Sequence, residues 1–254
     1  MFPSRFARLA IALLTLAVPA AANILTVGPA GSGAQFTEIQ AAVDAALEDD
    51  VILVKPGTYQ RIAVDKPLRI LGDGTGTVRI SGSAPAVTIH DIGAGAELAL
   101  SAVEVVATSD GSVILLQNCP GTVVLQDVNV PDTLVFEAGV QVESCARALL
   151  LDSRVTASFQ EGAVRAQDSE LWIANSEITG LFALGFLFFG AAPGVAVVNS
   201  TLHVWRSQIL GGGGDVITSP KMGGPGGAGI EARGSTLDLF GGPGSQVTGG
   251  LGPL

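Results

Sequence analysis

Several kinds of residue are scarce in this 254-residue chain, and each scarcity excludes a class of protein. Two cysteines and two histidines are too few for a disulfide-rich scaffold or for a zinc site with Cys or His ligands. With 13 Lys and Arg against 23 Asp and Glu, the clustered basic charge that binds nucleic acid is missing. We therefore expect no nucleic-acid partner. Glycine and hydrophobic residues are plentiful: the chain has 34 Gly, and 48% of its residues are hydrophobic. This composition indicates many short strands joined by tight turns.

The first 22 residues are typical of a secretory signal peptide. Arg5 and Arg8 supply the positive region, Leu9–Val18 is a ten-residue apolar run, and Ala20–Ala22 fits a small-residue cleavage site. This run is too short to span a membrane, as is the later Leu181–Phe189, so we expect no transmembrane segment. The sequence predicts cleavage before Asn23 and a secreted, periplasmic or cell-surface protein.

A secreted protein is in an oxidising environment, in which two cysteines can form a disulfide. Cys119 and Cys145 are separated by nearly one period of the repeat described below. Two alternatives stay open for them: a disulfide, or two buried thiols that stack on each other.

Residues 23–50 read as an N-terminal cap. Glu38–Leu47 has the spacing of a short amphipathic helix, and Thr37 with Gln40 has the form of a capping box. Apolar runs then predict strands, with a turn at Lys55–Thr58. The expected strands are Val51–Val54, Ile62–Val64, Leu68–Leu71 and Thr77–Ile80.

From about residue 94 the chain repeats itself. Each copy ends in an aliphatic residue, and these ends are nearly evenly spaced until the last step, which is longer: Val105, Val130, Val155, Ile178 and Ile209. Two further aliphatic positions recur in each copy: Leu98, Val123, Ala148, Leu171 and Leu202, and Leu100, Leu125, Leu150, Ile173 and Val204. A step of about 25 residues suits one coil of a parallel β-helix, and these positions become inward stacks.

Residues 51–254 are therefore predicted to form about eight coils, with Gly-rich loops near the C-terminus, including 211–229. The first coil would expose an open sheet edge, and the Glu38–Leu47 helix is well placed to cover it. The last residues, Gly249–Leu254, offer no obvious cap. We expect oligomerisation through that end as one outcome.

Residues 24–74 resemble the entry segment of pectin methylesterases and related right-handed parallel β-helix proteins, the pectin lyase-like fold. The matching parts are Phe36–Ala46, Lys55–Tyr59 and Ile70–Gly74, about a fifth of the chain. The resemblance implies an all-β fold: a single-stranded right-handed parallel β-helix with a short N-terminal capping α-helix. Enzymes and non-catalytic proteins share this segment, so it does not imply an activity.

The catalytic runs of those esterases are retained in fragments. The family uses two Asp on adjacent coils as acid and nucleophile, and Asp132 and Asp152 are the weak candidates here. The aromatic residues of both runs and the Arg-containing third run are missing, and the lyase and polygalacturonase runs are absent.

A second set of positions lies three residues before each closing aliphatic: Ala102, Asp127, Asp152, Asn175 and Arg206. If the register holds, Asp127 and Asp152 stack about 5 Å apart. Such a pair could bind Ca²⁺ or act as acid and base. The alternative is a polar turn ladder that hydrogen-bonds backbone, and we favour it, so that no cofactor is expected.

Outward positions carry the chain's two tryptophans. Trp172, His203 and Trp205 fall on one face of the predicted coils, and aromatic faces of this kind stack on sugar rings. The alternative is that the insert around Leu181–Phe189 folds back and covers them.

The first functional hypothesis is an exported non-catalytic β-helix protein, structural or carbohydrate-binding at the cell surface, with a polysaccharide or surface glycan as partner. One alternative is a pectin-type esterase or lyase with degenerate motifs. Another is a module of a larger adhesin or assembly.

Overall fold

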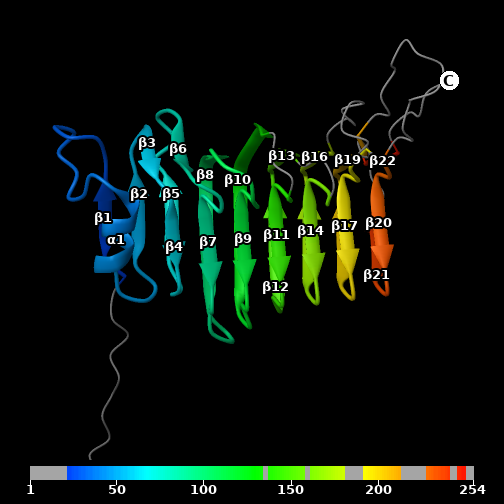
Figure 1. Ribbon diagram of the computed structural model, residues 1–254. Helices are drawn as coiled ribbons and strands as arrows, with labels where there is room; N and C mark the ends of the chain where they lie inside the picture. Colours follow the sequence, from blue (N-terminus) through cyan, green and yellow to red (C-terminus); the bar gives the residue numbers. More distant parts are fainter. Residues whose placement is uncertain are drawn as a thin grey trace, which may run out of the picture.

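The computed structural model describes residues 22–133, 137–157, 161–180, 191–212, 227–240 and 245–249. Most of the expected signal peptide, the insert around Leu181–Phe189, most of the loop 211–229 and the last residues of the chain lie outside these ranges. Over the described ranges the chain is a rod of stacked coils, with α1 (Ile39–Ala45) at one end and the last coil at the other (Figure 1). All its strand pairs are parallel, as a coil repeat requires. The expected all-β parallel β-helix is confirmed.

Each complete coil has three faces. Face 1 is the main path of the larger sheet: β1 (Ile24–Val27), β2 (Val51–Val54), β5 (Arg69–Gly72), β8 (Glu97–Ala107), β10 (Thr122–Thr133), β12 (Arg147–Leu151), β15 (Glu170–Ala174), β18 (Thr201–Trp205) and β21 (Thr236–Phe240). Face 2 holds the later halves of β8 and β10 together with β3 (Gly57–Gln60), β6 (Val78–Gly82), β13 (Arg154–Ala157), β16 (Glu177–Gly180), β19 (Gln208–Leu210) and β22 (Gln246–Thr248). Face 3 is the smaller sheet: β4 (Ile62–Val64), β7 (Val87–His90), β9 (Ile114–Gln117), β11 (Val140–Glu143), β14 (Val164–Gln167), β17 (Val195–Val198) and β20 (Ile230–Arg233).

The predicted register is the observed one. Val123 pairs with Leu98 and with Ala148, and Leu171 pairs with Ala148 and with Leu202. All five of these side chains are buried. Alternation along each strand thus sends one aliphatic set into a continuous core and leaves the other set outside.

The helix covers the first coil but differs from its prediction. It begins after Glu38 and ends at Ala45, and no side chain caps its first turn, so the capping box expected from Thr37 is not formed. The polar side chains are used elsewhere. Glu38 accepts a hydrogen bond from the Gln60 backbone N–H (3.1 Å), and Gln40 pairs with the backbone N–H and C=O of Ala63 (2.7 and 3.2 Å). These bonds fix the helix to β3 and β4.

Three further differences concern the first coils. The turn expected at Lys55–Thr58 is shorter, because Gly57 already belongs to β3 and pairs with Val78. Strand β1 was not foreseen; it pairs along its whole length with β2. β5 and β6 begin one residue later than expected and end one and two residues later.

The far end of the rod differs from the interior. On β21, Leu237 and Leu239 continue the two inward stacks, yet they are 38% and 52% exposed. Their counterparts one coil earlier, Leu202 and Val204, are buried. Within the described residues no helix is long and apolar enough to cross a membrane.

Candidate functional site

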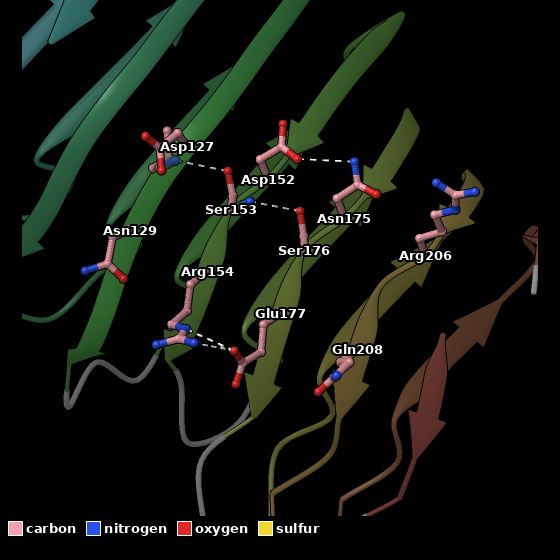
Figure 2. Close-up of a pocket in the computed structure, with 11 residues that line it drawn as sticks. Asp127, Asn129, Asp152, Ser153, Arg154, Asn175, Ser176, Glu177, Arg206 and Gln208 are labelled. Carbon is pink, nitrogen blue, oxygen red and sulfur yellow. Dashed lines mark hydrogen bonds and ion pairs between the residues drawn. The ribbon is translucent and has the colours of Figure 1, made fainter. Parts of the chain in front are cut away.

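A polar groove of about 480 Å³ follows the corner between faces 1 and 2 (Figure 2). One wall is the corner column, the other is the outward column of face 2, and both run along the rod. The corner column is Asp127, Asp152, Asn175 and Arg206, and the face 2 column is Asn129, Arg154, Glu177 and Gln208. Figure 2 shows the two columns as parallel rows, with Ser153 and Ser176 between them.

The corner residues have the backbone conformation that a one-residue corner needs. Their φ angles lie between 46° and 51°, in the left-handed region, where Asp and Asn are tolerated better than other non-glycine residues. The structure therefore contains the predicted column of corner residues on successive coils. Asp152 connects its neighbours, because it accepts hydrogen bonds from the side chains of Asn175 (3.2 Å) and Gln126 (3.4 Å).

Buried serines form the floor of the groove. The Ser153 hydroxyl accepts a hydrogen bond from the Val128 N–H, and the Ser176 hydroxyl accepts one from the Ser153 N–H (both 3.1 Å). Each hydroxyl donates to a carbonyl two residues earlier, that of Leu151 (2.7 Å) or Ala174 (2.8 Å). These bonds satisfy amides that have turned away from the strand ladders, and they hold the corner column rigid.

The face 2 column pairs charges between coils. Arg154 binds Glu177 at 2.6 Å, and Asn129 donates to Glu104 (3.2 Å), which also pairs with Arg79 at 2.6 Å. A second hollow of about 390 Å³ shares Asp127 and Asn129 with the first and extends toward the helical end. The two hollows make one elongated groove with donors and acceptors along its length.

An aromatic patch lies on face 1, beside the groove. We define it as Trp172, His203, Trp205 and Phe240. The Trp172 and His203 rings stack with centroids 3.9 Å apart and 20° between planes, and Trp205 lies against Phe240 at 5.8 Å. Trp172 is 36% exposed and Trp205 46%. The register predicted that these residues would share a face, and the structure brings them together.

Charged neighbours hold the patch in place. The Trp172 indole N–H donates to Glu170 (2.6 Å), and His203 Nδ1 lies 3.0 Å from Asp238. The bond from Trp172, assisted by Arg147, lowers the pKa of Glu170. Arg206 joins the patch to the groove, because its guanidinium lies 5.7 Å from the centre of the Trp205 ring while its side chain lines the groove.

The two carboxylate pairs considered from the sequence, Asp127 with Asp152 and Asp132 with Asp152, differ in their placement. Asp127 and Asp152 occupy the same corner on adjacent coils. Asp132 and Asp152 occupy different places on their coils. Asp152 is at the corner, whereas Asp132 is in β10 just before Thr133, which pairs with Ala157 on face 2. The Asp132 side chain lies outside the described residues. Among the described residues no group of three or more His, Cys, Asp or Glu side chains is arranged to hold a metal ion. Catalysis by Asp132 and Asp152 and calcium binding by Asp127 and Asp152 stay alternatives to the polar ladder. The covering role of the insert 181–190 also stays an alternative, because the insert lies outside the described residues.

The two cysteines are buried free thiols in this structure, so of the two alternatives left open for them it shows buried thiols and not the disulfide. They occupy the second corner, between faces 3 and 1, at the position that later coils give to Ser169, Ser200 and Ser235. Each thiol donates to the carbonyl two residues earlier (3.3 Å), as the serines do. Cys145 can instead donate its one proton to the Cys119 sulfur; this hydrogen bond lowers the pKa of Cys119 and, together with burial, raises that of Cys145.

Several site residues were not foreseen from the sequence. Glu170 supports the patch, and Arg154 and Glu177 line the groove. The register could have placed all three, because each shares a strand with a residue that was placed. The second corner column was also not predicted from the sequence. In the structure its residues share the left-handed backbone of the first corner, with φ between 48° and 60°. Its members are Asp91, Asn118, Ser144, Asp168, Asn199 and Gly234.

Comparison with known proteins shows the fold. No family model and no curated protein matches the chain. Among solved structures, it is similar to the pectate lyase Pel9A, with a TM-score of 0.54 and 14% identity over 80% of this chain and 57% of that one. A pectin methylesterase in complex with a hexasaccharide matches 87% of this chain and 81% of that one at 14% identity (TM-score 0.45). The pectin methylesterase from Aspergillus niger matches 90% of each chain at 12% identity (TM-score 0.36).

Proposed function

We propose that this chain is an exported, non-catalytic carbohydrate-binding protein. It has the right-handed parallel β-helix fold and spans little more than half the length of the pectate lyase that it matches. A polysaccharide lies along the groove and stacks a sugar ring on the aromatic patch. The observation that carries this proposal is the pair of partly exposed tryptophans beside an elongated polar groove, joined to it by Arg206.

The chemistry of the two surfaces is complementary for such a ligand. Sugar rings present C–H faces to aromatic rings and hydroxyls to polar groups, and the patch and groove offer one of each. Both surfaces are preorganised. Glu170 holds the Trp172 ring by a hydrogen bond, Asp238 lies beside the His203 ring, and the serine floor holds the corner column, so that little freedom of these side chains is lost on binding.

Binding is tested with the chain that begins at Asn23. A glycan array identifies a ligand, and titration calorimetry measures its affinity. Trp205→Ala should weaken binding about tenfold or more, because truncating a central aromatic contact commonly costs that much. Trp172→Ala should do the same. Leu115→Ala, outward on face 3, is the matched control and should leave affinity unchanged. Equal affinity in all three variants would refute the patch as the binding surface.

A second candidate is a pectin-type esterase or lyase. It is favoured by the stacked Asp127 and Asp152, two carboxylates on one wall of the groove. The test is release of methanol, or of unsaturated products, from methyl-esterified pectin. Turnover by the wild-type chain that disappears in Asp152→Asn, and in either Asp127→Asn or Asp132→Asn, would establish this function and overturn the first.

A third candidate is a module of a larger assembly. It is favoured by the exposed ends of the inward stacks at Leu237 and Leu239. Light scattering over a concentration series tests it: a mass that rises with concentration in the wild type, and does not rise in Leu239→Lys, supports assembly through this end. A constant monomer mass speaks against it.

A further inference from the structure

The carboxylate of Asp50 lies against the residue that signal-peptide cleavage would make the first of the chain. Asp50 Oδ1 accepts hydrogen bonds from the Asn23 backbone N–H (2.7 Å) and side-chain amide (3.2 Å), and Oδ2 accepts one from the Leu47 N–H (2.9 Å). The residue is only 3% exposed. It therefore presents a buried acceptor to the Asn23 nitrogen.

This buried carboxylate has no cationic partner within the described residues. The neighbouring charges are directed elsewhere. Lys66 Nζ donates to the carbonyls of Val43 and Ala46 (both 3.2 Å), Glu48 and Asp49 are exposed, and Arg69 contributes its backbone N–H to the Asp50 carbonyl. A buried carboxylate without a countercharge is uncommon, because desolvation of the charge is costly.

Cleavage would supply that countercharge at the same atom. Hydrolysis of the Ala22–Asn23 peptide bond by a signal peptidase adds one water. The Ala22 carbonyl leaves as a carboxylate, and the Asn23 nitrogen takes up a proton and becomes an ammonium group. The backbone nitrogen of Asn23 donates to Asp50, while the Asn23 carbonyl accepts from Val51 (2.9 Å), so the new charge disrupts no strand ladder.

We propose that Asp50 is the receptor for the new N-terminus: signal-peptide removal at Asn23 creates an ion pair with Asp50 that locks β1 onto the first coil, so that the mature chain is more stable than its precursor. This inference rests on the proposed export but not on carbohydrate binding. The hydrogen bond from the Asn23 backbone, followed by that from Leu47, lowers the pKa of Asp50, which keeps it ionised for such a pair.

The test compares two chains made in the cytosol as fusions, each released by a protease that leaves no extra residue. One begins at Asn23 and has the ammonium group there. The other begins at Ala20 and has a neutral amide at Asn23. At pH 6.5 the first should melt about 2–4 °C higher, the shift that one well-placed charged contact gives in a domain of this size. The difference should vanish in Asp50→Asn and persist in Asp49→Asn, the exposed neighbour.

The pH profile separates the ion pair from a merely structural role of Asp50. An α-amino group has an ordinary pKa of about 7.7–8.0, and pairing raises it. The chain that begins at Asn23 should therefore have its full gain in melting temperature below about pH 7.7. This gain should disappear as the pH rises through the raised pKa of the α-amino group. An equal melting temperature for the two chains, or a difference that survives in Asp50→Asn, would overturn the proposal.

Two further measurements keep the proposal testable if Asp50→Asn does not fold. Amine labelling of the Asn23 chain, read by mass spectrometry of the N-terminal peptide, gives the pKa of the α-amino group in the folded and urea-unfolded states. A folded value above the unfolded one supports the ion pair, and equal values refute it. The exported protein must also begin at Asn23; any other first residue contradicts the proposal.

Discussion

At the scale of single residues, buried hydroxyls and thiols connect the coils as the strand ladders do. Ser176 accepts a hydrogen bond from the amide of one coil and donates to its own. Cys119 and Cys145 fill the equivalent position of the second corner. A side chain that looks isolated in sequence therefore belongs to a column, and its removal affects the coil before it.

The serine floor gives the first prediction. Ser176→Ala leaves the buried Ser153 N–H without an acceptor, so the free energy of unfolding should fall by about 1–3 kcal/mol. Urea unfolding measures this. Ser101→Ala, outward on β8, serves as control and should change stability by less than about 0.5 kcal/mol. Similar losses in both variants would mean that the floor hydrogen bond contributes nothing.

The cysteine column gives the second prediction. The double variant Cys119→Ser and Cys145→Ser should keep its stability within about 1 kcal/mol, because each hydroxyl finds the carbonyl that the thiol now uses. Val130→Ser, at a buried site of the inward stack, should be clearly destabilised. The wild-type protein should contain two thiols that react only after unfolding. A mass two hydrogens lower, with no reactive thiol, would instead establish the disulfide.

At the scale of elements, the corners combine a strained backbone with a polar side chain. Most corner residues are Asp or Asn, but Ala102 has φ of 56° without a side chain suited to that conformation. Ala102→Asn should raise the free energy of unfolding by about 0.5–1 kcal/mol, since Asn is better tolerated in the left-handed region. Ala99→Asn, three residues earlier in the strand, should lower it. Thermal unfolding compares the two, and a loss at position 102 would contradict the corner interpretation.

The same scale shows how far sequence reasoning extends. Aliphatic periodicity predicted the pairing of β8, β10, β12, β15 and β18 residue by residue, because a one-residue slip would turn the inward stack outward. The helix cap was not predictable in this way. Thr37 and Gln40 are residue types that suit a capping box, but Gln40 binds β4 and Glu38 binds β3, two strands that follow the helix by about 20 residues. The corner wall of the groove was predicted from the register, and the other wall could have been, because its residues follow the corner residues by two positions on each coil.

At the scale of the whole molecule, the helical end and the acidic charge govern solution behaviour. Ile39 of α1 is fully buried on the first coil. Ile39→Ala should cost about 2–5 kcal/mol and promote aggregation, because it loosens the cover over an open sheet edge. Light scattering on heating measures this. Ala45→Ser, on the exposed side of the helix, should behave like the wild type.

Stability should also fall in acid. The pKa values of Asp50, Asp73 and Glu170 are lowered by hydrogen bonds, from Asn23, Thr75 and Trp172 respectively. Groups with lowered folded pKa values stabilise the protein above their ordinary range, and this contribution is lost as the pH falls through the folded values. The melting temperature should therefore be flat near neutrality and drop below about pH 4. Unchanged melting down to pH 3 would contradict this.

The repeated register of face 1 has a consequence for growth of the rod. From β10 to β12 each residue of Thr122–Gln126 pairs with the one that holds the same place in the next coil, so these side chains return to their own columns. Duplicating one such unit would insert a complete layer, lengthening groove and core together without a new junction. Gene segments that encode a single coil are thus the natural increments by which a lineage could match this surface to longer or shorter polymers.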